Sequence, residues 1–156
     1  MSASSPSLNA RLAQAEIMCG QRGERLTPLR RRVLEILLRS ERPLGAYEIL
    51  DLLRADGRGG GPPTVYRALD FLLQNGLVHR LATLNAYTSC HQPDRHHGAQ
   101  FLICTRCHRV RELGSPELSE HIRTEASRQG FSAASEIVEI QGQCNHCRDA
   151  GAARGA

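Results

Sequence analysis

The sequence predicts an α+β fold in two parts: an N-terminal winged helix-turn-helix and a small C-terminal α/β domain that holds a structural zinc ion. Amphipathic helical patterns follow one another through residues 8–75, and two short strand-like segments come after them. Two Cys-x-x-Cys pairs then bracket residues 104–147. We expect residues 1–90 to form the winged helix, residues 91–98 a hinge and residues 99–156 the second domain.

Four helices are expected in the N-terminal part, and start or stop signals delimit them. The second helix follows a Thr-Pro pair, in which Thr is the N-cap and Pro the first helical residue. The fourth helix ends at an Asn-Gly pair, which favours a left-handed C-cap. The expected segments are a helix from Leu8 that stops near Gly20 and Gly23, a helix from Pro28 that ends before Pro43, a helix over Ala46–Ala55 and a helix over Thr64–Asn75.

The fourth helix and the strands after it, Leu77–Leu84 and Ala86–Cys90, have the order of a reading helix and its wing. In this architecture the first turns of the reading helix meet base edges in the DNA major groove. Arginine can pair bidentately with guanine, and tyrosine can contact a thymine methyl or a phosphate. A solvated polar face is the simpler interpretation of so short a motif, but the adjacent wing favours DNA. The expected contacts are Thr64, Tyr66 and Arg67.

The charge distribution also favours an anionic partner for the N-terminal part. Residues 1–90 carry 12 arginines against 8 acidic residues, whereas residues 91–156 carry 8 of each. No apolar run approaches the ~20 residues that span a membrane, and the N-terminus lacks the apolar core of a signal peptide. We therefore expect a cytoplasmic protein without a membrane partner, in which cysteines stay reduced and Cys-x-x-Cys pairs bind metal.

The two Cys-x-x-Cys pairs, 36 residues apart, predict a structural zinc site. Four thiolates complete the closed tetrahedron that structural zinc prefers. Two disulfides or four ordinary buried cysteines are the alternative, which the duplication of the pair disfavours. Between the pairs, the sequence indicates two strands, a helix and another strand, and the tail Arg148–Ala156 is expected to be disordered. The expected ligands are Cys104, Cys107, Cys144 and Cys147, whereas Cys19 is expected in the core.

Together, three motifs resemble the ferric uptake regulator (Fur) family: Arg25–Pro28, Pro62–Leu72 and the cysteine frame. The similarity covers nearly all of residues 8–148. It implies a bacterial transcriptional repressor that binds double-stranded operator DNA as a homodimer, has no small-molecule substrate and dimerises through its C-terminal domain. Between His79 and Glu112 the chain is similar to the zinc uptake regulator (Zur) branch, so zinc-dependent control of zinc-uptake genes is expected.

A second, regulatory zinc ion is expected at the boundary between the two parts, which makes about two zinc ions per chain. An imidazole, a thiolate and a carboxylate suit tetrahedral zinc, and a thiolate is too soft for an iron or manganese site of histidines and carboxylates. Taken singly, these residues have ordinary interpretations as surface or core positions. Their spacing around the hinge is similar to that of the Zur branch, and the ligands that this resemblance implies are His79, Cys90, His97 and Glu112, with His96 as the alternative to His97.

Because these ligands come from the wing, the hinge and the C-terminal domain, zinc would set the angle between the two parts. In a dimer it would therefore set the distance between two reading helices. An enzyme is not expected, since the zinc-deaminase, Gly-x-Ser-x-Gly and phosphate-loop patterns are absent from the sequence. The alternatives are a sibling regulator that senses iron, manganese, nickel or peroxide, and a zinc-ribbon module that binds protein.

Overall fold

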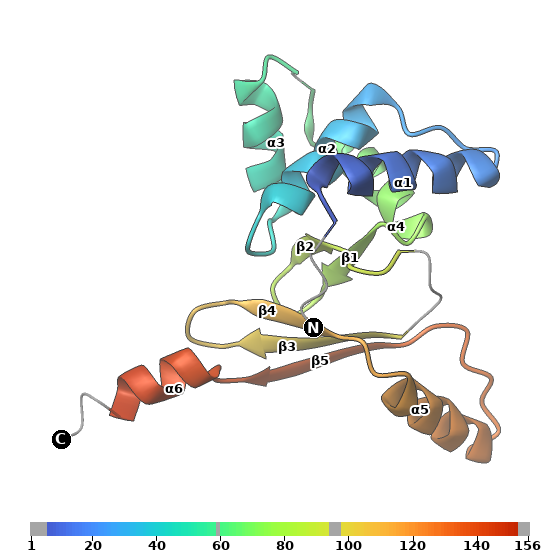
Figure 1. Ribbon diagram of the computed structural model, residues 1–156, viewed down its shortest axis with the longest axis vertical. Coiled ribbons are helices and arrows are strands. Elements are labelled where there is room, and N and C mark those ends of the chain that lie inside the picture. The colour runs from blue at the N-terminus through green and yellow to red at the C-terminus, as the bar shows by residue number, and fades with distance from the viewer. Residues whose placement is uncertain (1–5, 59, 94–97, 153–156) are drawn as a thin grey trace. The chain divides into compact units, whose positions relative to one another are not determined.

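The computed structural model describes residues 6–58, 60–93 and 98–152, and the chain divides into two compact units (Figure 1). The first unit comprises residues 1–94 and the second residues 95–156. Residues 94–97 of the predicted hinge lie outside the described ranges. Within those ranges, no helix is both long enough and apolar enough to cross a membrane.

Four helices of the first unit begin and end close to the predicted positions. They are α1 (Leu8–Gln21), α2 (Pro28–Arg39), α3 (Ala46–Ala55) and α4 (Pro62–Gln74). The Thr27 hydroxyl accepts a hydrogen bond from the backbone N–H of Arg30 at 3.4 Å, which confirms the predicted N-cap of α2. Helix α4 begins two residues earlier than predicted because its two prolines occupy the first helical turn, where the missing N–H groups have no cost.

Aliphatic side chains from all four helices form the core of the first unit, as a chain without tryptophan requires. Full burial of one such side chain contributes roughly 1.5–3 kcal/mol to the stability of the folded unit. Cys19 lies fully within this core, as expected. The large aliphatic side chains of these helices that are at most 2% exposed are Leu12, Val33, Leu34, Leu37, Ile49, Leu50, Leu53, Val65, Leu69 and Leu72.

The chain leaves α4 through a left-handed residue and enters a hairpin. Gly76 has φ +67°, its N–H donates to the Leu73 carbonyl at 3.0 Å, and the Leu77 N–H donates to the Leu72 carbonyl at 2.9 Å. This pair of bonds is a Schellman motif and confirms the predicted C-cap. Strands β1 (Val78–Leu81) and β2 (Ala86–Ser89) then pair antiparallel, which completes the winged helix.

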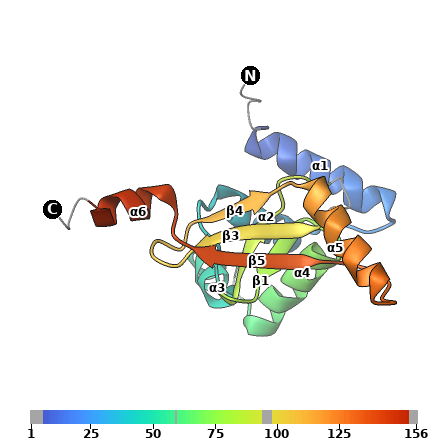
Figure 2. The same ribbon diagram turned by 90° about the horizontal axis from the view of Figure 1, so that it is seen from below.

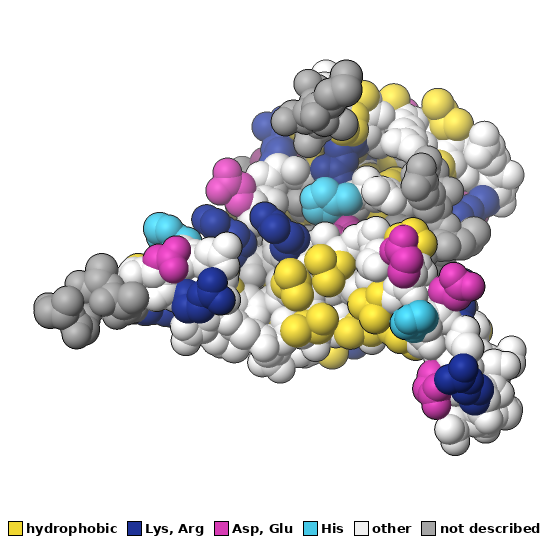
Figure 3. All heavy atoms as spheres, turned by 60° about the horizontal axis from the view of Figure 1, so that its bottom comes forward, with side chains coloured by type: hydrophobic (Ala, Val, Ile, Leu, Met, Phe, Trp, Pro, Cys, Tyr) yellow, Lys and Arg dark blue, Asp and Glu magenta, His cyan; other side chains and the backbone are white. Residues whose placement is uncertain are grey.

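The second unit is a three-stranded sheet with a helix at each end of its strands (Figure 2). Strand β3 (Ala99–Cys104) lies between β4 (Val110–Leu113), to which it is antiparallel, and β5 (Ile137–Gly142), to which it is parallel. Helix α5 (Pro116–Arg128) precedes β5, and α6 (Asn145–Ala152) follows it. Figure 3 shows hydrophobic side chains gathered over the face that carries the sheet.

Two sequence-based expectations for the second unit are wrong. Strand β3 ends at Cys104, so one strand and not two lies between Cys107 and α5, because the apolar run that forms β3 precedes the first cysteine pair. The tail was expected to be disordered from Arg148, but α6 continues to Ala152. This helix starts at the second cysteine pair, where the Arg148 N–H donates to the Cys144 carbonyl at 3.0 Å.

Candidate metal centres and nucleic-acid interface

Four cysteines of the second unit come together at one end of its sheet. Their four thiol sulfurs all lie within 4.8 Å of one another. The parallel pairing of β3 with β5 sets Cys104 beside Gly142, so the turn after β3 and the turn after β5 are adjacent. We call this group the four-cysteine cluster: Cys104, Cys107, Cys144 and Cys147.

The spacing within the four-cysteine cluster suits a tetrahedral zinc ion. The Cys107 and Cys144 sulfurs are 3.8 Å apart, and none of the four cysteines forms a disulfide. A tetrahedron with zinc–sulfur bonds of about 2.3 Å has sulfur–sulfur edges of about 3.8 Å. The guanidinium of Arg106 donates to the Cys147 carbonyl at 3.0 Å and links the two pairs. The cluster therefore has the donor chemistry and the size of a closed, structural zinc site.

Backbone groups already favour one thiolate in this cluster. The N–H of Cys144 donates to the Cys104 sulfur at 3.4 Å, and this bond, with those from the Cys107 and Arg106 backbone, lowers the pKa of Cys104 to about 5. Burial, followed by hydrogen bonds to the neighbouring thiols, raises the pKa of Cys147 to about 12. Without a metal ion, the sulfurs therefore do not all ionise near neutral pH. A divalent cation would ionise all four, because it replaces mutual repulsion with attraction.

Two side chains of types that can bind metal, His79 and Cys90, lie at the end of the hairpin in the first unit. His79 is in β1 opposite Thr88, and Cys90 follows the last residue of β2. Since side chains two residues apart in a strand share a face, Cys90 is the diagonal neighbour of His79. Their ligand atoms lie within 4.8 Å of each other, and Cys90 is only 3% exposed. We call His79 and Cys90 the wing-end pair.

The other predicted ligands of the regulatory site belong to different segments. Glu112 lies in β4 of the second unit, half-buried and opposite Phe101 in the sheet register. The alternative histidines, His96 and His97, lie outside the described residues. The complete ligand set remains a prediction.

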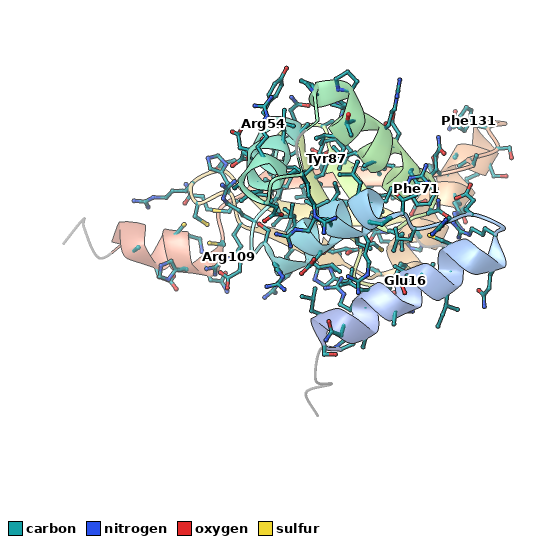
Figure 4. All side chains as sticks on the ribbon, turned by 90° about the horizontal axis from the view of Figure 1, so that it is seen from above. Glu16, Arg54, Phe71, Tyr87, Arg109 and Phe131 are labelled. Carbon is teal, nitrogen blue, oxygen red and sulfur yellow. The ribbon has the colours of Figure 1, made fainter. Side chains whose placement is uncertain are left out.

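Helix α4 presents the polar stripe predicted for a reading helix. Val65, Leu69 and Leu72 are buried on one side, whereas Tyr66 and Arg67 are exposed on the other. Thr64, the third predicted DNA contact, is half-buried in the first turn. Phe71 of α4 is labelled in Figure 4, and the Arg30 guanidinium of α2 lies over its ring, 3.7 Å from the ring centre. This contact adds to the core packing between α4 and α2.

A buried amide at the end of α4 was missed by the sequence reasoning, which assigned Asn75 only a C-cap role. Asn75 is 2% exposed, and its Nδ2 donates to the Glu24 carboxylate at 2.5 Å and to the Phe71 carbonyl at 3.1 Å. Its Oδ1 accepts from Arg22 at 3.3 Å. These bonds tie the reading helix to the segment between α1 and α2. No local sequence signal indicates partners more than 50 residues away.

A winged helix joined to an α/β unit with a four-thiol cluster is the architecture of a metal-binding regulator of transcription. The chain belongs to the Ferric uptake regulator family, whose model matches residues 21–141. Members of this family regulate transcription and are not enzymes, in agreement with the absence of enzymatic motifs from the sequence.

Relatives of this chain include a curated protein and two solved structures. The Zinc uptake regulation protein of Escherichia coli (strain K12) is 41% identical over 144 residues, which are 92% of this chain and 84% of that protein. A zinc uptake regulator complexed with zinc and DNA is 39% identical, with a TM-score of 0.88 over 94% of this chain and 99% of the other. A crystal structure of holo XcZur is 40% identical, with a TM-score of 0.82 over 90% and 99% of the two chains. These matches confirm the predicted fold class.

Proposed function

We propose that this chain is a zinc-responsive transcriptional repressor that binds double-stranded operator DNA as a homodimer and controls zinc-uptake genes. The observation that carries this proposal is the wing-end pair, a soft cysteine sulfur beside an imidazole at the point where the winged helix ends. Such a pair favours zinc over the iron or manganese of sibling regulators. The similarity to zinc uptake regulators supports the same metal. A repressor of this kind acts on the chromosome in the bacterial cytoplasm.

Two zinc ions per chain have separate roles in this proposal. The ion in the four-cysteine cluster is structural, since four thiolates leave no open position for a further ligand. The second ion is regulatory and is held by the wing-end pair together with Glu112 and His97, or His96 in place of His97. The structural ion joins elements of the second unit only, so its binding is coupled to the folding of that unit.

The DNA is read by the first turns of α4 through Thr64, Tyr66 and Arg67. Arg67 is exposed and suited to a bidentate contact with guanine, and the exposed ring of Tyr66 can pack on a thymine methyl group or reach a phosphate. The arginine-rich first unit supplies phosphate contacts, so affinity should fall steeply as salt rises.

Dimerisation is assigned to the second unit, whose sheet exposes large apolar side chains. Leu102 of β3 and Ile140 of β5 are register partners and are 37% and 43% exposed. Apolar groups that sit side by side on a sheet surface mark a face that another protein surface covers. A second copy of the chain on this face would place two reading helices in one complex.

In this proposal, zinc controls DNA binding by restricting the angle between the two units. The regulatory ligands come from both units and from the segment between them, so an ion held by all of them restricts the angle between the units. Two reading helices fit successive half-sites only when they are separated by about one helical turn of DNA. A difference of a few kcal/mol in zinc affinity between fitting and non-fitting arrangements is enough to switch the population.

The test combines zinc content with operator binding. We expect the purified chain to hold about two zinc ions, mild chelation to remove one, and DNA binding to be lost with it. Cys90→Ser should retain the structural ion and no longer bind DNA in response to zinc. His121→Ala is the matched control, because His121 is an exposed histidine of α5 outside both ligand sets.

Three outcomes would contradict the proposal. An unchanged zinc response of Cys90→Ser would refute the regulatory site. A stronger response to iron or manganese than to zinc would favour a sibling regulator. Absence of any salt-dependent DNA affinity would favour the protein-binding module.

A further inference from the structure

Cys90 is the last residue of the predicted winged helix before the connector (the predicted hinge, residues 91–98), and both of its backbone polar groups are bonded within the first unit. Its N–H donates to the Leu77 carbonyl at 2.9 Å. Its carbonyl accepts a hydrogen bond from Nη2 of Arg11, also at 2.9 Å. The first bond belongs to the hairpin, whereas the second comes from α1, 79 residues earlier in the chain.

Helix α1 holds Arg11 in place through the residues around it. Leu12 and Ala15 are fully buried in the core of the first unit, and Leu8 packs against the same core. Arg11 itself is half-buried, so its aliphatic stem follows the packed face while the guanidinium reaches the end of β2. Because the helix is anchored by its neighbours, the guanidinium is presented to the Cys90 carbonyl from a rigid support.

A zinc ligand needs this kind of support more than an ordinary core residue does. Zinc–sulfur bonds have lengths near 2.3 Å, so a thiolate whose backbone moves loses affinity. Groups that orient ligands without touching the metal commonly change metal affinity by about 10- to 100-fold when they are removed. At the end of β2, the hairpin provides the bond to the N–H of Cys90, and α1 provides the bond to its carbonyl.

We propose that Arg11 is a positioning residue for the regulatory zinc ion, because its guanidinium fixes the backbone of Cys90 where the winged helix meets the connector. This inference rests on the proposed role of Cys90 as a zinc ligand. It gives α1 a function beyond core packing: the helix holds the metal-binding end of the wing in the geometry that zinc requires.

The principal variant is Arg11→Met, which keeps an apolar stem for packing and removes the hydrogen-bond donor. Arg11→Lys is the rescue variant, because it restores the charge and a donor. The matched control is Arg39→Met, which removes one charge from an exposed arginine of α2 whose guanidinium pairs with Glu35 of the same helix. All variants are studied as full chains with the structural zinc ion in place.

Two measurements separate positioning from general stability. The first is zinc affinity at the regulatory site, by competition with a chelator. The second is the thiolate-to-metal absorption band that appears when cobalt(II) is added to the regulatory site, which reports the bond to the Cys90 sulfur. We expect Arg11→Met to lower zinc affinity by about 10- to 100-fold and to require correspondingly more cobalt(II) for the band. Arg11→Lys should recover part of this loss, and DNA affinity at saturating zinc should match that of Arg39→Met.

Zinc affinity and a cobalt(II) band equal to those of Arg39→Met would overturn the inference, even if the melting temperature of Arg11→Met fell. Cys90→Ser distinguishes this failure from failure of the proposed function. If Cys90→Ser loses regulatory zinc and Arg11→Met does not, only the role of Arg11 is refuted. If Cys90→Ser also binds zinc normally, the regulatory site and the role of Arg11 are refuted together.

Discussion

The buried amide of Asn75 allows a quantitative test of how the reading helix is held. Asn75→Ala removes its three side-chain hydrogen bonds, to Glu24, Phe71 and Arg22. Glu24 and Arg22 are exposed and regain water, and the Phe71 carbonyl keeps the bond from the backbone N–H of residue 75. Each lost bond therefore costs about 0.5–1.5 kcal/mol rather than the full cost of a buried orphan. The expected loss in free energy of unfolding is roughly 3 kcal/mol, or about 12–24 °C in the melting temperature of a unit of this size.

Thermal unfolding of the zinc-loaded chain, followed by circular dichroism, measures this loss. Gln74→Ala is the control, because Gln74 is the exposed neighbour in the same helix turn and should change stability by less than about 0.5 kcal/mol. Asn75→Asp keeps the shape but sets a carboxylate against Glu24, so it should destabilise the unit at neutral pH and less at acidic pH. If Asn75→Ala lowered the melting temperature no more than Gln74→Ala does, the reasoning from these hydrogen bonds would be refuted.

Three further predictions concern packing, pH and metal. Gly98→Ala should destabilise the second unit by about 1–3 kcal/mol, since a Cβ there would collide with the carboxylate of Glu136, whose side chain is 5% exposed. The control is Gly142→Ala, because a Cβ at Gly142 meets open space. Equal melting temperatures of the two variants in thermal unfolding would disprove the clash. Arg42, followed by a backbone N–H at the start of α3, lowers the pKa of Glu48. The stabilisation from Glu48 is therefore complete above the unfolded pKa of about 4.3 and is lost as pH falls through the folded pKa. The difference in melting temperature between the wild type and Glu48→Gln should accordingly vanish at the acidic end of a pH series. Removal of the ion from the four-cysteine cluster by strong chelation should raise hydrogen exchange throughout the second unit and leave the four-helix core protected; continued protection of β3 and β5 would show that the unit folds without metal.

Short-range patterns were sufficient to predict much of the secondary structure. The start of α2 follows from Thr27-Pro28, and the end of α4 follows from Asn75-Gly76, because a cap depends on residues within one or two turns. The buried stripe of α4 follows from its helical spacing, and the four-cysteine cluster was predicted from two short spacers. In each case the interacting residues are neighbours in the sequence or a repeated local motif.

Tertiary structure decided what depends on contacts between distant segments. The parallel pairing of β3 with β5 sets Cys104 beside Gly142 and so brings together two cysteine turns that lie far apart in the sequence. Two partners of Asn75, Arg22 and Glu24, lie 53 and 51 residues from it in the sequence, and Arg11 lies 79 residues from Cys90. Hydrogen bonds of this kind depend on the packing of whole helices against a hairpin, which local propensity does not specify. The sequence alone therefore predicted the helices and the grouping of the four cysteines, whereas the hydrogen bonds of Asn75 and of the Cys90 carbonyl depend on the folded core.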